Sequence, residues 1–492
     1  MAKNIKCFFI CLLCIIVMIN SNTAALSFAD QADATTAVED GTIPVEQERD
    51  QTKWPAQPDV SADAAIVIDC TTGCILYQKD IYTAYYPASI TKMLTAVLAL
   101  ENCSFTETVT VSQDAVDNAG GSMIGLVSGE QLSLEDALYG MLLMSANEVA
   151  NAIAEHVSGS TIAAFADMMN EKVKELGGVN SNFVNPNGLH DPNHYTCAYD
   201  MALICKEAST LPELLKISGT RTYQIPATNK NVARDLVNHH RFIRKTLNYE
   251  YAIAGKTGGT DEALTTLITF AKKDDMLIAA IVLHVDTAEH AYEDTINMCN
   301  FAFDNYTAYK IKENETAVQN SIPELFDDDD EFKLKDSSLL TIDKDAIITL
   351  PSTASFSDAV KTVTFNPPEE YEHGNNIVGK ISYKYDGTDV GAADIYYYVD
   401  SYPMTAARFK SLWPSYLIPP DTYFKDDIID GSKKANENET TEDNNKTAHI
   451  NKKALLYALL TSFLIVFAGI LVIYVYIPER EWKKRQRRLN RR

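Results

Sequence analysis

The sequence predicts an α/β fold of the α+β type, in which an antiparallel sheet carries a block of helices, followed by a small all-β domain and a transmembrane helix. Three observations support this fold. Strand-like apolar runs stand near both ends of residues 61–318, and helical stretches fill the region between them. Short β-prone runs broken by proline and glycine occupy residues 332–420. Residues 454–477 carry no charge and are long enough to span a bilayer about 30 Å thick.

The predicted sheet is built from two hairpins. Residues 65–69 and 74–77 are apolar runs on either side of a Thr-Thr-Gly turn. Residues 264–270 and 277–285 flank a charged turn in the same way, and both patterns are typical of paired antiparallel strands. Between the hairpins, Ser133 with an acidic residue three positions later resembles a capping box, so a helix is expected to begin there.

Changes in composition mark the remaining segments. Residues 30–60 are polar and acidic and are expected to form a flexible lead-in, and residues 421–453 form a similarly polar linker. An acidic run at 327–331 separates the first domain from the β-rich one, which contains no motif that points to chemistry. Strands of the β-rich domain are expected at 346–350, 360–365 and 377–383.

The two ends of the chain indicate export. Lysines precede a short apolar run at residues 7–19, and cleavage after Ala25 or Ala29 would remove a signal peptide of residues 1–29. An uncleaved anchor is the alternative. Residues 478–492 are strongly basic, which places them in the cytoplasm and the bulk of the chain outside. We therefore expect a single-pass protein of the cell membrane whose main domains are extracytoplasmic.

Net charge and cysteine content exclude several classes of protein. The chain carries a formal charge of −24, which makes nucleic acid and anionic surfaces poor partners. Of its nine cysteines, those in the predicted signal peptide are removed with it. The others lack the regular close spacing of a disulfide framework or a zinc site, and no metal is expected. Cys70 and Cys74 could pair across the first hairpin, although two buried thiols are the favoured interpretation.

A Ser-x-x-Lys string at Ser89 and Lys92 is the first candidate for chemistry. It opens a run with the apolar periodicity of a buried helix, on which residues three apart have Cβ atoms about 5–6 Å apart. A serine hydroxyl needs an adjacent base, and a lysine serves as one when burial or another cation, here Lys256, lowers its pKa. The plainer interpretation is a serine that caps the helix beside a solvated lysine.

Two further strings complete the set. Ser145 and Asn147 stand in a short connection between two helical stretches, where the hydroxyl can relay a proton and the amide can hold a substrate amide. Alone, they could simply end one helix and start another. Lys256, Thr257 and Gly258 follow a strand-like run. An edge strand can bind a peptide by β-augmentation while its lysine and hydroxyl meet a carboxylate, and an ordinary glycine turn is the alternative.

With their flanks and in this order, the three strings resemble those of the D-alanyl-D-alanine carboxypeptidases, low-molecular-mass penicillin-binding proteins of the serine peptidase S11 type. The similar stretches are residues 86–93, 145–148, 182–189, 255–258 and 260–263. The resemblance implies a penicillin-binding/β-lactamase-like transpeptidase domain that needs no cofactor. It also implies a peptidoglycan pentapeptide as substrate and β-lactam antibiotics as inhibitors.

The resemblance assigns roles to individual residues. Ser89 would be acylated by the carbonyl of the penultimate D-alanine as the last D-alanine leaves, and water would then release the trimmed peptide. Backbone N–H groups of Ser89 and Gly259 would form the oxyanion hole. Lys256 and Thr257 would grip the terminal carboxylate of the substrate.

The chain departs from the family pattern in three places. Many members end in an amphipathic helix on the membrane surface, whereas residues 454–477 are expected to span it. An aromatic residue or a histidine often follows the Lys-Thr-Gly string, where this chain has Gly259 and therefore a more open subsite. Many members carry an arginine at the place of residues 289–292, which contain none, so carboxylate selection is expected to be weaker or supplied elsewhere.

Two other functions are left open by the residues. A class A β-lactamase shares the fold and two of the strings, but its rapid deacylation requires a glutamate, and residues 185–191 contain none. A catalytically idle wall-binding scaffold is the second alternative. The chain keeps Ser89, Lys92 and Lys256, which argues against this alternative. A site that no longer catalyses a reaction has little physical reason to keep two lysines beside a serine.

Overall fold

The computed structural model describes residues 43–44, 49–315, 340–366, 368 and 372–399. Four predicted segments lie outside these residues: the signal peptide 1–29, the linker 421–453, the transmembrane segment 454–477 and the basic tail 478–492. Among the helices of the described part of the chain, none combines the length and apolar character that crossing a membrane requires.

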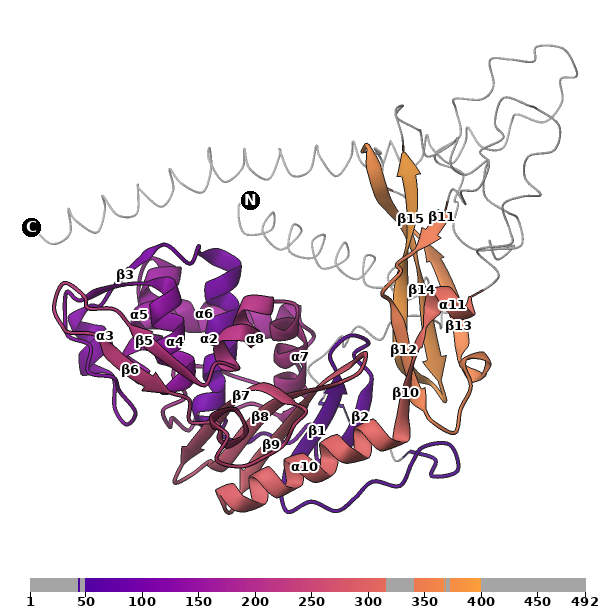
Figure 1. The fold of residues 1–492 in the computed structure, drawn as a ribbon, viewed down its shortest axis with the longest axis horizontal. Coiled ribbons are helices and arrows are strands. Elements are labelled where there is room, and N and C mark those ends of the chain that lie inside the picture. Colours follow the sequence, from indigo (N-terminus) through magenta and orange to yellow (C-terminus); the bar gives the residue numbers. More distant parts are fainter. Residues whose placement is uncertain (1–42, 45–48, 316–339, 367, 369–371, 400–492) are drawn as a thin grey trace, which may run out of the picture. The chain divides into compact units, whose positions relative to one another are not determined.

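A five-stranded antiparallel sheet forms the centre of the first domain, with the strand order β2-β1-β9-β8-β7 (Figure 1). Both predicted hairpins are confirmed, and pairing of β1 with β9 joins them into one sheet. Strand β7 lies at an edge of this sheet. The strands are β1 (Ala64–Asp69), β2 (Ile75–Lys79), β7 (Ala252–Thr260), β8 (Leu264–Lys273) and β9 (Met276–Val285).

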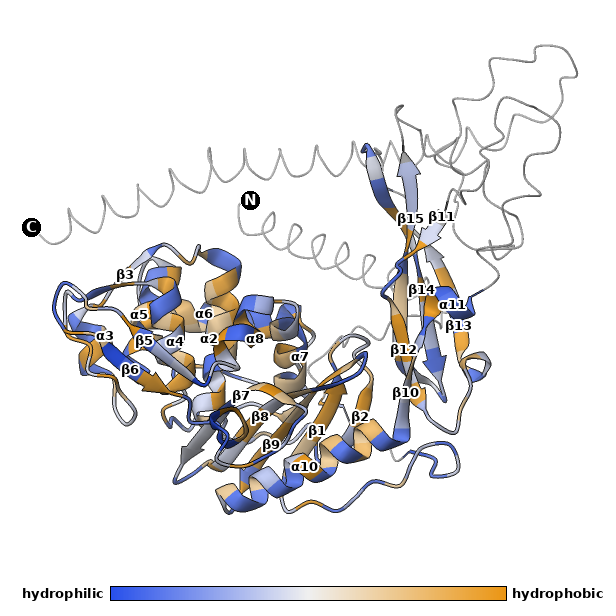
Figure 2. Ribbon diagram, viewed as in Figure 1, coloured by the Kyte–Doolittle hydropathy of each residue, from blue (hydrophilic) through white to orange (hydrophobic). Residues whose placement is uncertain are grey.

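Alternate side chains of the central strands point to opposite faces of this sheet. Ile66 and Ile68 of β1 join a core shared with the helical block. Ala65 and Val67 join a second core, shared with α10 (Ala288–Asn305). Both faces are therefore buried, which explains the almost continuous apolar runs of β8 and β9. Helix α10 mixes polar and apolar residues, as the colours in Figure 2 show.

The helical block is centred on α2, whose residues from Lys92 to Ala99 are all buried. Helix α4 begins where the sequence predicts, because the N–H of Asp136 donates to Ser133 Oγ at 3.0 Å. The helices before α10 are η1 (Ala88–Thr91), α2 (Lys92–Asn102), α3 (Gln113–Asp117), α4 (Leu134–Leu143), α5 (Asn147–Ser158), α6 (Ile162–Glu175), α7 (Ala198–Ser209), α8 (Pro212–Ser218) and α9 (Arg241–Arg244). Two short hairpins accompany them, formed by β3 (Thr108–Thr110) with β4 (Gln131–Ser133) and β5 (Thr222–Ile225) with β6 (Arg234–Val237).

A second antiparallel sheet has the order β10-β12-β15-β14-β13, with β11 paired to β15. Strand β10 (Tyr306–Lys310) follows α10 directly, inside the range 61–318 expected for the first domain, yet it pairs with β12. The expected β-rich character of 332–420 is confirmed for the described residues from 340 to 399. Its elements, with the short α11 (Ile311–Asn314) before them, are β11 (Leu340–Ile342), β12 (Ile347–Pro351), η4 (Phe356–Asp358), β13 (Val360–Phe365), β14 (Gly374–Tyr385) and β15 (Thr388–Val399).

The flexible lead-in predicted for residues 30–60 is wrong for residues 49–60. Trp54 is only 3% exposed and packs edge-on against the ring of Tyr385 at 5.3 Å between centroids. The guanidinium of Arg49 lies 4.3 Å from the centre of the Trp54 ring and donates to the Ile75 carbonyl. A polar composition did not predict this packing because one buried tryptophan is enough to anchor an otherwise polar segment.

The thiols of Cys70 and Cys74 are both free and buried, which confirms the favoured interpretation over a disulfide. Burial raises the pKa of each thiol. The turn between them depends on Gly73, whose φ of 78° suits a residue without a side chain.

Candidate active site

The candidate nucleophile, Ser89, lies in a tight turn that is fixed from two sides. The preceding Ala88 has a φ of 49°, in the left-handed region. Thr266 Oγ1 of β8 donates to the Pro87 carbonyl at 2.8 Å. Gly188 packs against the Ala88 carbonyl so closely that a Cβ there would overlap it. Ser89 therefore occupies the 3-10 turn η1 in front of α2, whereas the sequence predicted it as the start of the helix itself.

Lys92 is the first residue of α2 and is fully buried. Its Nζ lies 2.9 Å from Ser89 Oγ and 2.6 Å from Asn147 Oδ1, and it also donates to the Asn187 carbonyl. Burial, and then the charge of Lys256, hold the pKa of Lys92 well below its usual value. A neutral amine has two N–H groups and one lone pair. With both N–H groups accepted by the asparagines, the lone pair is left for the Ser89 hydroxyl.

Ser145 connects α4 to α5, as predicted, with a φ of 59°. Its Oγ accepts a hydrogen bond from Lys256 Nζ at 3.0 Å. Lys256 also donates to the Thr257 carbonyl at 2.7 Å and is 1% exposed. Burial lowers the pKa of Lys256 to about 7, so this lysine exchanges its proton in the neutral range.

The Lys-Thr-Gly string lies on β7, at the sheet edge that the prediction requires. A Cβ on Gly258 would lie 2.9 Å from the backbone nitrogen of Ser89 and would overlap Thr266 Oγ1. Only glycine allows this close approach of β7 to the nucleophile turn. Thr257 is half-buried and Gly259 is exposed, so both can meet a ligand on the open side of β7.

Two further residues that sequence reasoning did not assign contribute to this arrangement. The Asn187 carbonyl accepts from Lys92, and its backbone position follows from the close contact of Gly188. Glu148 is fully buried next to Asn147, and its Oε1 accepts N–H bonds from three consecutive residues of the neighbouring loop, Ile124, Gly125 and Leu126. Its Oε2 has no hydrogen-bond partner among the described residues, and its charge opposes the lowering of the Lys92 pKa.

The chain shows clear similarity to known proteins over this region. A family model described as D-alanyl-D-alanine carboxypeptidase (Peptidase S11) matches residues 51–287. The carboxypeptidase DacF of Bacillus subtilis is 35% identical over 265 residues, which cover 52% of this chain and 66% of DacF. A D-alanyl-D-alanine carboxypeptidase of Mycobacterium tuberculosis is 30% identical over 218 residues, covering 44% and 72% of the two chains.

A longer alignment covers more of the chain. The carboxypeptidase DacA of Haemophilus influenzae is 28% identical over 349 residues, covering 69% of this chain and 84% of DacA. Among solved structures, the Streptomyces K15 DD-transpeptidase has a TM-score of 0.47 and 25% identity, covering 51% of this chain and 99% of that one. Together with the matched family model, these sequence relatives show that the chain belongs to the S11 family of D-alanyl-D-alanine carboxypeptidases.

Proposed function

We propose that this protein is a serine-type D-Ala-D-Ala carboxypeptidase that removes the terminal D-alanine from peptidoglycan stem peptides through an acyl-enzyme. The single observation that carries the proposal is the 2.9 Å contact between Ser89 Oγ and the buried Nζ of Lys92. The printed names of the relatives, all carboxypeptidases of this specificity, support the choice of substrate.

Substrate binding uses the edge of the first sheet. The D-Ala-D-Ala end of the stem peptide lies along β7 and extends the sheet by backbone hydrogen bonds. Its terminal carboxylate binds the Thr257 hydroxyl and the protonated Lys256. The Asn147 side chain lies beside the scissile region because its Oδ1 is bonded to Lys92.

Acylation follows from the two lysines. Neutral Lys92 takes the Ser89 proton as Oγ bonds to the carbonyl carbon of the penultimate D-alanine. The negative oxygen that forms is held by the N–H groups of Ser89 and Gly259, and losing such a donor typically costs about 10²–10³ in rate. The C–N bond then breaks. The leaving amine takes a proton from Ser145, which is resupplied by Lys256 at 3.0 Å.

Deacylation returns the enzyme to its starting state. Water attacks the ester carbon, Lys256, which acylation has left neutral, takes the water proton, and Ser89 Oγ leaves with the proton that Lys92 took from it. The segment 185–191 supplies a backbone carbonyl to Lys92 and no glutamate that could activate the water. We therefore expect β-lactams to acylate Ser89 and to remain attached for minutes or longer, which distinguishes the protein from a class A β-lactamase.

The same proposal includes the setting of the reaction. The signal peptide 1–29, the uncharged stretch 454–477 and the basic tail 478–492 support a single-pass cell-membrane protein with its catalytic domain extracytoplasmic. The peptidoglycan substrate is on that side of the membrane. Protease added to intact cells should degrade the main domain and spare the C-terminal tail; protection of the main domain would contradict this orientation.

The activity is tested by release of D-alanine from diacetyl-Lys-D-Ala-D-Ala. The wild-type protein should release it, and Ser89→Ala should abolish release. Ser133→Ala is a matched control, because it removes a helix-capping hydroxyl at the opposite end of α4 from Ser145. Release that persists in Ser89→Ala would refute the mechanism, and absence of release by the wild type would favour the idle scaffold.

A further inference from the structure

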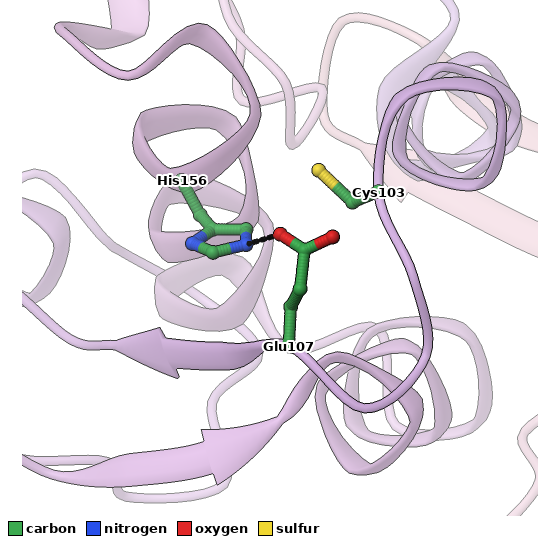
Figure 3. Close-up of side chains that lie close together, drawn as sticks. All are labelled: Cys103, Glu107 and His156. Atoms are coloured by element: carbon green, nitrogen blue, oxygen red, sulfur yellow. Dashed lines mark hydrogen bonds and ion pairs between the residues drawn. The ribbon is translucent and has the colours of Figure 1, made fainter.

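A second cluster of reactive side chains lies outside the site described above. Cys103, Glu107 and His156 each offer one ligand atom, and these three atoms lie within 4.8 Å of one another (Figure 3). His156 Nε2 is 3.1 Å from Glu107 Oε2. The close-up view shows the Cys103 side chain beside this carboxylate. Nothing in the proposed reaction uses these residues.

The backbone holds each of the three side chains in place. Cys103 ends α2, and its N–H donates to the Ala99 carbonyl at 3.0 Å. Glu107 closes a tight turn in which the N–H of Ser104 donates to Glu107 Oε1 at 2.6 Å. His156 lies in the last turn of α5. Since the three positions are fixed by secondary structure, little chain entropy is lost when their side chains converge.

The set of ligand atoms suits zinc. A thiolate sulfur, an imidazole nitrogen and a carboxylate oxygen are all zinc ligands, with bonds of about 2.0–2.3 Å. A tetrahedral ion with such bonds needs ligand atoms roughly 3.3–3.7 Å apart, which small side-chain rotations reach from the present spacing. Cys103 and His156 are half-buried and Glu107 is exposed, so the fourth position opens to water.

The electrostatics of the cluster favour a cation. The ion pair of Glu107 found among the described residues is with His156, and no lysine or arginine there neutralises the carboxylate. A divalent ion would displace the thiol proton to water and would leave a neutral site, balanced by one thiolate and one carboxylate.

We propose that Cys103, Glu107 and His156 form a zinc site that ties together the C-terminal ends of α2 and α5. These two packed helices carry Lys92 and Asn147 at their N-terminal ends, where the side chains meet at 2.6 Å. At 1.5 Å per residue, the ion would lie roughly 15 Å along the helices from that contact. It therefore acts as a structural clamp and takes no part in the reaction.

The test uses the full-length protein in mild detergent, stripped with a chelator and titrated with zinc chloride. One zinc ion per chain is expected at this site, with a rise in the thermal unfolding midpoint. Cys103→Ser and His156→Gln should weaken binding by more than the roughly 10–100-fold that loss of an outer-shell partner costs. Cobalt in place of zinc should show a thiolate charge-transfer absorption that Cys103→Ser removes.

His290→Gln is the matched control. His290 Nδ1 pairs with Asp286 at 2.6 Å on the surface, so it is a histidine–carboxylate pair without a cysteine. This variant should bind zinc as the wild type does. Glu107→Gln, an exposed and nearly isosteric change, supplies a further variant if Cys103→Ser does not fold. Zinc affinity unchanged in His156→Gln and Glu107→Gln, or a cobalt spectrum without a thiolate band, would overturn the proposal.

Discussion

At the scale of single residues, the proposed chemistry depends on the charge states of two buried lysines, Lys92 and Lys256. In the proposed mechanism Lys92 must be neutral to take the Ser89 proton, and burial together with the charge of Lys256 favours that form by holding its pKa well below the usual value. The same proposal requires Lys256 to keep its proton to hold a carboxylate, and its pKa of about 7 places the loss of that proton near neutral pH. The two requirements oppose each other as the pH changes.

The pH dependence of kcat/KM should therefore be bell-shaped. The rate should rise with pH as Lys92 loses its proton and should fall as Lys256 loses its proton near pH 7. Lys256→Arg keeps the positive charge at every accessible pH but cannot return a proton to Ser145. The rate should therefore be lower at every pH, and the alkaline limb should disappear while the acid limb remains. An alkaline limb that stays near pH 7 in Lys256→Arg would show that another group is responsible.

At the scale of elements, the site depends on how closely β7 approaches the turn before α2. Gly258 brings the strand against the Ser89 backbone, whereas a Cβ on Gly259 would meet nothing closer than the Leu264 carbonyl at 3.3 Å. Two adjacent glycines of the same strand thus have different packing environments. This difference provides an internal control.

Gly258→Ala should slow acylation by fluorescent penicillin by about 100-fold, the order that a 1 Å misplacement of reacting groups costs. Gly259→Ala should slow it much less, because its Cβ has more space. The measurement is the rate of label incorporation into protein that is folded by circular dichroism. Equal losses in the two variants would indicate that the approach of β7 does not position Ser89.

Sequence patterns predicted the elements better than the contacts between them. The neighbourhood of Ser89 and Lys92 was predictable because helical spacing brings them together over three residues. The contact of Lys92 with Asn147 requires packing of α2 on α5 across 55 positions. The Asn187 carbonyl was not predictable because a backbone acceptor has no residue-type signature. The cluster of Cys103 with His156 was not predictable for the same reason as the Lys92–Asn147 contact, because it too depends on how α2 packs on α5.

At the scale of the whole molecule, side chains far apart in sequence connect the first domain to the second sheet. Trp54 packs between the rings of Tyr306 and Tyr385, and its Nε1 donates to Asp386 at 3.3 Å. Thr349 Oγ1 of β12 donates to the buried Asp69 at the end of β1 at 2.6 Å. The contacts of Trp54 explain why residues 49–60 pack against the rest of the described chain.

Trp54→Ala should lower the free energy of unfolding by about 3 kcal/mol, at the low end for large aromatic residues because the segment lies near the surface. Trp54→Phe should retain most of that stability, since it keeps the ring contacts with Tyr306 and Tyr385. The free energy of unfolding of both variants is measured by urea unfolding followed by far-ultraviolet circular dichroism, because this signal comes from the backbone and not from tryptophan. A Trp54→Ala midpoint equal to that of the wild type would show that this anchor contributes nothing.

The most direct test of the account is peptide mass mapping after labelling with benzylpenicillin. We expect one penicilloyl adduct per chain, on the peptide that contains Ser89, still present minutes after free antibiotic is removed. Lys92→Gln should lose this adduct while remaining folded. An adduct on a different residue, or benzylpenicillin hydrolysed rapidly without a trapped adduct, would contradict the assignment of Ser89 and Lys92 as nucleophile and base.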